Sequence, residues 1–201
     1  TLSLFVFCVF TARANSSIRK ETFIYSIKGT DTLRLDKYEI PGNEIKPCVI
    51  FAFGGGFTSG ARDKEAYIPY YNFLVQQGFS VIAIDYRLYL KGYKADRKLK
   101  AKDFISLFKK TIFVAVEDLF DATNYVLENA EKWNIDKNMI VTSGSSAGAI
   151  TVLQGEYERC NRIETAQRLP ADFKYAGVIA FAGAIFSDHG HLKWKETPAP
   201  V

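Results

Sequence analysis

The chain has 201 residues, of which 48% are hydrophobic and 24% are charged. This composition excludes a disordered chain and a fibre, and it favours one globular domain with a sizeable core. The formal net charge of +4 is too small for a typical nucleic-acid-binding protein, so no nucleic-acid partner is expected.

The N-terminal residues predict an export signal. Residues 2–10 form an almost unbroken apolar run, and Ala12 and Ala14 supply the small residues that signal peptidase recognises. The run is shorter than the roughly 20 apolar residues of a membrane-spanning helix, so no stable membrane anchor is expected. A buried N-terminal strand is the alternative. We therefore expect a signal peptide over residues 1–14, incomplete at its N-terminus, and a periplasmic or extracellular domain over 15–201.

Removal of that segment takes Cys8 with it and leaves Cys48 and Cys160. Cys48 opens an apolar strand and Cys160 lies late in an expected helix, so both are expected to be separate buried residues. One disulfide between them remains open, because spacing alone does not show that the geometry permits it. Cys and His do not occur at metal-ligand spacing, and no metal or cofactor is expected.

The middle of the chain predicts an α/β fold. Residues 22–27 and 32–40 alternate apolar with polar residues across a tight turn, which predicts an antiparallel hairpin at one edge of a sheet. Short apolar strands then alternate with helical stretches, which is typical of a parallel sheet covered on both faces. The expected strands are 48–53, 81–86, 139–143 and 176–182, and the expected helices are 66–77 and 113–133.

A possible nucleophile follows the strand 139–143. The segment Gly144-Ser145-Ser146-Ala147-Gly148 fits the GxSxG nucleophile elbow, with a helical stretch beginning at Ala147. The two glycines would relieve clashes at a sharp turn, and their register selects Ser146 over Ser143 and Ser145. The helix N-terminus would favour developing negative charge. The alternative is a Gly/Ser-rich turn without chemistry.

A glycine triplet ends the earlier strand 48–53. Phe51-Ala52-Phe53-Gly54-Gly55-Gly56-Phe57 exposes backbone N–H groups, as a serine acyl-transfer enzyme needs around the oxygen that becomes an oxyanion. A flexible turn or a phosphate loop is the alternative. No Gly-Lys-Ser/Thr follows the triplet, which argues against a phosphate loop.

Together these motifs resemble the α/β-hydrolase carboxylesterases and lipases, especially the hormone-sensitive-lipase-like and cholinesterase-like branches. The resemblance runs from about Lys46 to the end of the chain. It is carried by Gly54-Gly55-Gly56-Phe57, by Ile84-Asp85-Tyr86-Arg87-Leu88 and by residues 144–148. It implies the α/β-hydrolase fold, with a mostly parallel central sheet and helices on both faces. The basic stretch 87–110 is expected to be a solvated helical segment over the active-site side.

The resemblance also implies a mechanism. Ser146 would attack a carboxylic ester and form an acyl-enzyme, while the backbone N–H groups of Gly55, Gly56 and Ala147 hold the oxyanion. Asp85-Tyr86-Arg87 matches a structural stretch. Phe53 occupies the position where the lipase-like branch often has a His that supports the loop. This departure affects the assignment to a branch of the family but not the implied mechanism.

Ser146 also requires a histidine base and an acid, and in this fold they follow the serine in that order, acid first. Only His189 and His191 occur, with Asp188 directly before the first. Adjacent side chains diverge, and this segment follows the strand 176–182, one strand too early. The acid and the base are therefore expected beyond residue 201, with 198–201 opening the next strand and the C-terminal part of the fold truncated. An irregular role for either histidine stays open.

Other functions remain as alternatives. A peptidase or amidase of the same fold would use the same elbow, and a non-catalytic hydrolase-like binding protein would have the fold without the activity. The expected partner is a small-molecule or polymer-linked ester, and the sequence predicts no oligomeric state. Phe53, Phe57 and the tyrosines between residues 67 and 93 would either line an apolar pocket or pack in the core.

Overall fold

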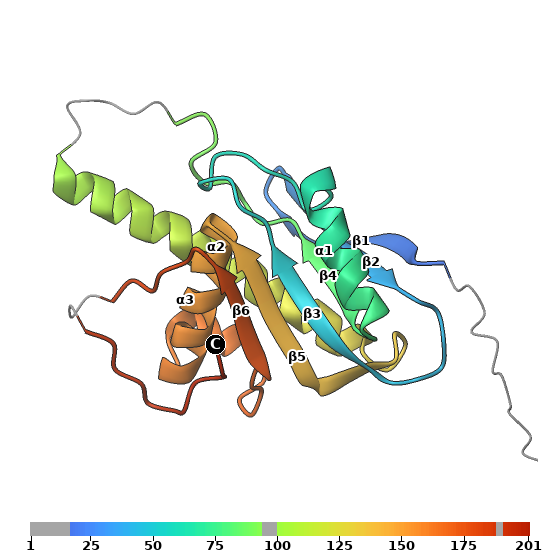
Figure 1. The fold of residues 1–201 in the computed structure, drawn as a ribbon. Coiled ribbons are helices and arrows are strands. Elements are labelled where there is room, and N and C mark those ends of the chain that lie inside the picture. Colours follow the sequence, from blue (N-terminus) through green and yellow to red (C-terminus); the bar gives the residue numbers. More distant parts are fainter. Residues whose placement is uncertain (1–16, 94–99, 188–190) are drawn as a thin grey trace, which may run out of the picture.

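The central element is one sheet of six strands, in the order β1-β2-β4-β3-β5-β6 (Figure 1). β1 pairs antiparallel with β2, β2 pairs antiparallel with β4, and all other neighbours are parallel. This confirms the expected hairpin at one edge and the mostly parallel sheet. The strands are β1 (Arg19–Lys28), β2 (Asp31–Glu39), β3 (Lys46–Ala52), β4 (Ser80–Ile84), β5 (Ile135–Ser145) and β6 (Gly177–Phe181).

The computed structural model describes residues 17–93, 100–187 and 191–201. The expected signal peptide 1–14, with Cys8 and its cleavage site, lies outside these residues, as do Asp188 and His189. Export therefore stays a prediction. Among the residues that are described, no helix is both long and apolar enough to cross a membrane.

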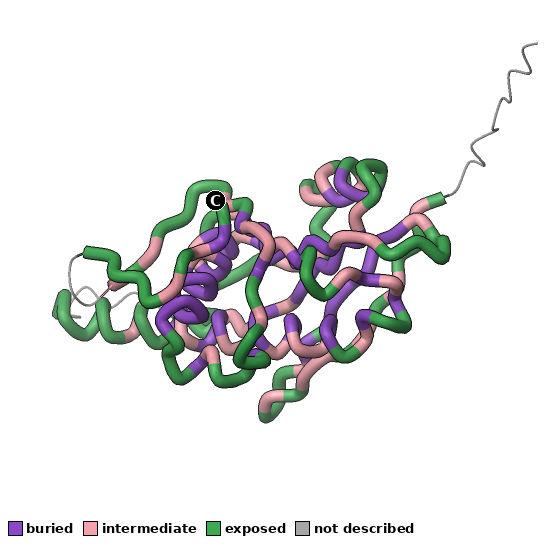
Figure 2. Tube along the Cα trace, turned by 90° about the horizontal axis from the view of Figure 1, so that it is seen from below, coloured by how far each residue is buried: buried purple, intermediate pink, exposed green. Residues whose placement is uncertain are grey.

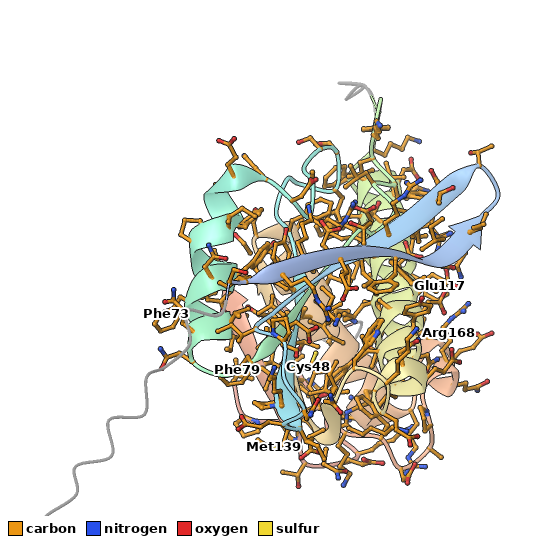
Figure 3. All side chains as sticks on the ribbon, turned by 90° about the vertical axis from the view of Figure 1, so that its right-hand side faces the viewer. Cys48, Phe73, Phe79, Glu117, Met139 and Arg168 are labelled. Atoms are coloured by element: carbon orange, nitrogen blue, oxygen red, sulfur yellow. The ribbon has the colours of Figure 1, made fainter. Side chains whose placement is uncertain are left out.

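Helices cover both faces of the sheet, as expected. A short 3-10 turn, η1 (Glu65–Tyr67), leads into α1 (Ile68–Gln76), which packs on β4 and β2. α2 (Ala101–Asn129) and α3 (Ala147–Asn161) pack together on the opposite face (Figures 1 and 3). A second 3-10 turn, η2 (Glu164–Arg168), is tied to α2 because Arg168 pairs with Glu117 and Asp121.

The basic stretch 87–110 differs from the expectation in its first part. Residues 87–93 form loop and turn, where a helical segment was expected. Helix α2 begins at Ala101, twelve residues before the start expected for the helix 113–133. The loop conformation is fixed by contacts outside the stretch, since the Leu90 N–H donates to the Phe57 carbonyl oxygen at 3.1 Å. From Ala101 to Lys110 the segment is helical and largely exposed, as expected.

The core lies between the sheet and the helices (Figure 2). β3, β4 and the inner face of α2 are its main parts, because parallel strands covered on both sides bury nearly every side chain. Cys48 on β3 (Figure 3) and Cys160 on α3 are both buried and free, so they form no disulfide with each other. The expectation of two separate buried cysteines is therefore confirmed.

The C-terminal residues lie against β6 and α3. The Val178 N–H donates to the Pro200 carbonyl oxygen at 2.8 Å, and the Ala199 N–H donates to the Glu156 carboxylate at 2.6 Å. Residues 198–201, expected to open a strand, have irregular structure. Their proline residues account for part of this, because proline lacks the N–H that a ladder requires.

Candidate active site

Ser146 occupies the single position between β5 and α3. Its backbone has φ 51° and ψ −114°, which is rare for a residue with a side chain and stores strain. Its N–H donates to the Phe181 carbonyl oxygen at 2.8 Å, and its carbonyl accepts from the Ile150 N–H at 2.9 Å. The strained turn is thus held by β6 on one side and by the first turn of α3 on the other.

The glycines of the elbow permit this turn. A Cβ on Gly144 would lie 2.4 Å from the Gly148 carbonyl carbon, and a Cβ on Gly148 would lie 2.0 Å from the Ala52 carbonyl oxygen. Both distances are far below van der Waals contact, and backbone atoms cannot move aside cheaply. The close packing of strand, turn and helix therefore requires glycine at both positions.

The three serines near the turn differ in accessibility. Ser146 is exposed, Ser145 is partly buried, and Ser143 is buried with its hydroxyl 3.1 Å from that of Tyr70. A nucleophile must meet its substrate, so the geometry favours Ser146.

The glycine triplet reaches the elbow across two neighbouring strands. β3 and β5 pair in parallel with Ala52 opposite Gly144, so the loops that follow them leave the same edge of the sheet. A Cβ on Gly54 would lie 3.3 Å from the Ser146 Cβ. The glycine loop therefore lies directly against the serine.

The hydrogen bonds of the loop orient its N–H groups. The Gly55 carbonyl oxygen accepts from the N–H groups of Thr58 and Ser59, both at 3.1 Å. Since this peptide unit is trans, the Gly56 N–H points away from that turn. The Gly54 N–H donates to the Tyr67 hydroxyl at 3.0 Å.

The N–H groups that the resemblance selected are among the unused donors of the loop and of the first turn of α3. Within the described part of the chain, the N–H groups of Gly55 and Gly56 donate to no protein acceptor. The Ala147 N–H belongs to the first turn of α3, where N–H groups lack an intrahelical partner. Gly54 and Ser146 already use theirs. The N–H groups of Gly55, Gly56 and Ala147 are thus available, and their role as oxyanion donors stays a prediction.

The described part of the chain brings no base to the serine. His191 is exposed, and its backbone carbonyl accepts from the Ser187 hydroxyl at 3.0 Å. No hydrogen bond joins a histidine or a carboxylate to the Ser146 hydroxyl among residues 17–93, 100–187 and 191–201. The same residues contain no group of three or more His, Cys, Asp or Glu side chains that could hold a metal ion.

The stretch from Asp85 to Arg87 is bonded to helix α2 and to the start of the glycine loop. The Arg87 guanidinium makes a bidentate ion pair with the fully buried Asp118, at 2.8 to 3.0 Å, and also bonds Glu117. The Tyr86 hydroxyl donates to the Phe53 carbonyl oxygen at 2.7 Å. Burial raises the pKa of this hydroxyl, so it remains a donor at every ordinary pH. These contacts agree with a structural role.

Aromatic side chains around the loop pack mainly in the core. Phe53 and Phe57 are 2% and 1% exposed, and Phe53 stacks on Tyr86 with ring centroids 4.5 Å apart. For these two phenylalanines the core interpretation is therefore confirmed over the pocket interpretation. Sequence reasoning placed Tyr86 in a structural stretch but missed the role of Tyr67 and the backbone partners of both hydroxyls, because no motif marks a hydroxyl that meets a loop from a distant part of the chain.

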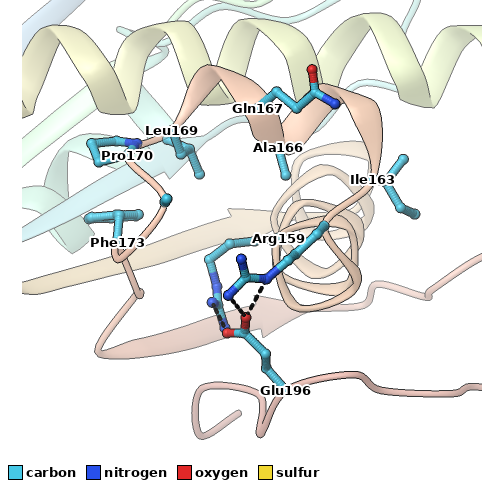
Figure 4. A pocket seen from close by; sticks show the side chains of 10 residues that line it. Arg159, Ile163, Ala166, Gln167, Leu169, Pro170, Phe173 and Glu196 are labelled. Atoms are coloured by element: carbon cyan, nitrogen blue, oxygen red, sulfur yellow. Dashed lines mark hydrogen bonds and ion pairs between the residues drawn. The ribbon is translucent and has the colours of Figure 1, made fainter.

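A separate cavity of about 340 Å³ lies between η2 and the C-terminal segment (Figure 4). Arg159 and Arg162 both pair with Glu196 at its edge, at 3.3 and 2.6 Å. Hydrogen bonding to Arg162 lowers the pKa of the Glu196 carboxyl. The cavity includes no residue of the elbow or the glycine triplet, so it is not part of this site.

A strained serine between a parallel strand and a helix, beside a glycine loop from the neighbouring strand, defines the α/β-hydrolase fold. Comparison with known proteins agrees. The BD-FAE family model matches residues 101–191, which include the elbow. Apo Thermogutta terrifontis esterase 2 superposes with a TM-score of 0.62 at 22% identity, covering 86% of this chain and 59% of that one. Esterase Est22 gives 0.60 at 18% identity, covering 84% and 45%.

Two sequence relatives are esterases as well. Esterase B1 of Culex pipiens is 28% identical over 124 residues, which are 61% of this chain and 21% of that protein. Fumonisin B1 esterase of Sphingopyxis macrogoltabida is 29% identical over 105 residues, 51% and 18% of the two chains. The chain thus spans about a fifth of the length of these curated relatives. The resemblance to α/β-hydrolase carboxylesterases is confirmed.

Proposed function

We propose that this chain supplies the nucleophile and the oxyanion hole of a serine esterase that hydrolyses carboxylic esters. The observation that carries the proposal is the exposed Ser146, held at φ 51° at the N-terminus of α3 with the glycine loop in contact. Each of the relatives named above is an esterase, which supports an ester as the substrate.

In the proposed reaction the Ser146 hydroxyl oxygen attacks the ester carbonyl carbon and gives a tetrahedral intermediate. The N–H groups of Gly55, Gly56 and Ala147 donate to its oxyanion, and each such donor lowers the barrier by about 3 kcal/mol. Collapse of the intermediate expels the alcohol and leaves an acyl-enzyme. Water then attacks the acyl group and releases the acid, which restores Ser146.

A base must accept the Ser146 proton and pass it to the leaving alcohol. The described residues place no such group at the hydroxyl, and the base and its acid remain predictions outside residues 1–201. The positive end of the α3 dipole favours negative charge beside Ser146 throughout the reaction.

The decisive experiment uses the full-length protein with short-chain p-nitrophenyl esters. Ser146→Ala is expected to lower kcat by several orders of magnitude, because the catalytic residues act as a unit. Ser143→Ala, which changes a buried serine of the preceding strand β5, should stay within a few-fold of the original. A fluorophosphonate probe should modify Ser146. Most activity surviving in Ser146→Ala, or an adduct on Ser143 or Ser145, would contradict the assignment.

The same experiment separates the alternatives. A peptidase or amidase would show Ser146-dependent cleavage of a matched anilide as well as of the ester, whereas the esterase names of the relatives favour the ester alone. A non-catalytic binding protein would show no Ser146-dependent turnover on either. The substrate class remains a small-molecule or polymer-linked ester. The predicted export is tested separately by N-terminal sequencing of the secreted protein, which is expected to begin after Ala14.

A further inference from the structure

Two tyrosine hydroxyls hold one peptide unit at the start of the glycine loop. The peptide between Phe53 and Gly54 has its carbonyl oxygen 2.7 Å from the Tyr86 hydroxyl and its N–H 3.0 Å from the Tyr67 hydroxyl. Because the unit is trans, its carbonyl and its N–H point in opposite directions. The tyrosines therefore hold the same peptide plane from two sides.

Both tyrosines are themselves fixed. Tyr86 is 2% exposed, and its ring stacks on Phe53. Tyr67 ends η1 and packs its ring on Phe51 at 4.9 Å between centroids. A hydroxyl on a rigid ring sets the orientation of the peptide it contacts, whereas a flexible side chain would follow the peptide.

The held unit lies directly before the proposed oxyanion donors. The next N–H along the chain is that of Gly55, and the unit after it, between Gly55 and Gly56, is fixed by the bonds from Thr58 and Ser59 to the Gly55 carbonyl. The segment that carries both donors is thus held at its start by the tyrosines and at its end by this turn. Gly55 has φ 144° and Gly56 has φ 62°, so the glycines between these two points add little stiffness of their own.

We propose that Tyr67 and Tyr86 are positioning residues that aim the Gly55 and Gly56 N–H groups at the oxyanion. The inference rests on the proposed function. Their hydroxyls do not touch the substrate; they fix the peptide plane from which the donors follow. A displacement of about 1 Å in such a group is enough to cost on the order of 100-fold in rate.

The test compares Tyr67→Phe, Tyr86→Phe and a matched control in the full-length enzyme. Both variants keep the ring and remove only the hydroxyl. Tyr175→Phe is the control, because its buried hydroxyl also makes a 2.8 Å hydrogen bond, to Thr123, in a part of the core away from the loop. Thermal midpoints measured alongside the kinetics show whether stability alone explains any loss.

Each loop variant is expected to lower kcat about 10- to 100-fold, with KM changed by less than about threefold. Binding of a trifluoromethyl ketone, which forms an oxyanion on Ser146, should weaken by a similar factor. Tyr175→Phe should lower the thermal midpoint comparably and leave kcat within about twofold. In the double variant the losses should be less than multiplicative, because both hydroxyls act on one peptide unit.

Two results would overturn the inference in distinguishable ways. If the unmodified enzyme shows Ser146-dependent turnover but the two variants match Tyr175→Phe in kcat, the tyrosines are structural only and the proposed function stands. If the unmodified enzyme shows no Ser146-dependent turnover, the proposed function fails and the inference fails with it.

Discussion

The Ser146 N–H donates to the Phe181 carbonyl oxygen at 2.8 Å, one residue beyond the point where Ser145 pairs with Phe181 in the ladder between β5 and β6. The bond continues the sheet into the elbow. It also uses the serine N–H within the fold, so the proposed oxyanion donor on this side is the Ala147 N–H. The position of Ser146 therefore depends on β6 as well as on β5.

The close contact between the elbow and β3 predicts a steep cost for Gly148→Ala. The added Cβ would meet the Ala52 and Phe53 carbonyl oxygens at 2.0 and 2.6 Å, and these backbone atoms cannot withdraw without moving the strand. A loss of about 3 kcal/mol or more in the free energy of unfolding is expected. Urea unfolding followed by tryptophan fluorescence measures it.

Gly155→Ala in the same helix is the control for that variant. Its Cβ would meet the end of the Leu119 side chain at 2.8 Å, and a terminal methyl can rotate away. Alanine also gains about 1 kcal/mol of helix propensity over glycine. The two effects oppose each other, so stability should change little. Equal losses in the two variants would show that the elbow has no special requirement at residue 148.

Alanine variants of Gly56 and Gly29 separate the effect of backbone strain on stability from its effect on catalysis. Both glycines have φ 62°, and neither has a neighbour within 3.5 Å of an added Cβ. Alanine at either position should cost about 1 to 2 kcal/mol of stability. Only Gly56→Ala should also lower kcat, by tenfold or more, because relief of the strain rotates an oxyanion donor. Parallel measurement of thermal midpoint and ester hydrolysis checks this, and an equal loss of kcat in Gly29→Ala would refute it.

The Arg87–Asp118 pair predicts non-additive effects on stability. Arg87→Met leaves the fully buried Asp118 carboxylate without its cation and should cost about 3 to 5 kcal/mol. Adding Asp118→Asn removes the stranded charge while keeping an acceptor for the Arg87 backbone N–H, so the double variant should recover part of the loss. A double-mutant cycle in urea measures the coupling, and strictly additive losses would mean that the pair contributes nothing specific.

The burial of Glu158 predicts that removing its negative charge by substitution stabilises the protein, by an amount that depends on pH. Glu158 is 6% exposed, bonds Gln154 and Thr165, and pairs with no cation in the described structure. Burial raises the pKa of its carboxyl above the ordinary 4.5, although the two hydrogen bonds oppose the shift. The folded state thus favours the protonated acid. Its contribution to stability is fully present below pH 4.5 and is lost as the pH rises through the raised pKa.

Glu158→Gln has no such titration and can keep both hydrogen bonds. The thermal midpoint of the variant should therefore exceed that of the original protein at neutral pH, and the difference should close below about pH 4.5. Midpoints measured across the pH range provide the test. A difference that does not change with pH would mean that Glu158 has an ordinary pKa in the folded protein.

The inner strands β3 and β4 were predictable because they are buried on both faces. Val49 and Ile82 belong to runs that are apolar without interruption, which marks a parallel sheet in the sequence. The start of α2 was not predictable from periodicity. Phe104 and Ile105 are exposed in its first turns, so no single apolar stripe marks that part of the helix.

The site was predictable from the sequence only at positions where close packing permits a single residue type. Gly144 and Gly148 had to be glycine, and this fixed the register of Ser146. The contacts of Tyr67 and Tyr86 with the Phe53–Gly54 peptide leave no such mark, because a tyrosine hydroxyl serves many roles and the partner is a backbone group. Such contacts become visible only when the chain is folded.

The order of the strands has a consequence for where a substrate can enter. From the central β3 the chain crosses to β4 on one side through α1, and it later returns to β5 on the other side through α2, which lies on the opposite face. The loop after β3 therefore leads toward one face, and the loop after β5 leads toward the other. In open α/β sheets, ligands bind beyond the carboxyl ends of the strands, where successive loops turn toward opposite faces. Gly54 and Ser146 lie at such a point, so we expect a substrate to enter between these two loops, and changes in loop length should reshape that entrance without altering the sheet.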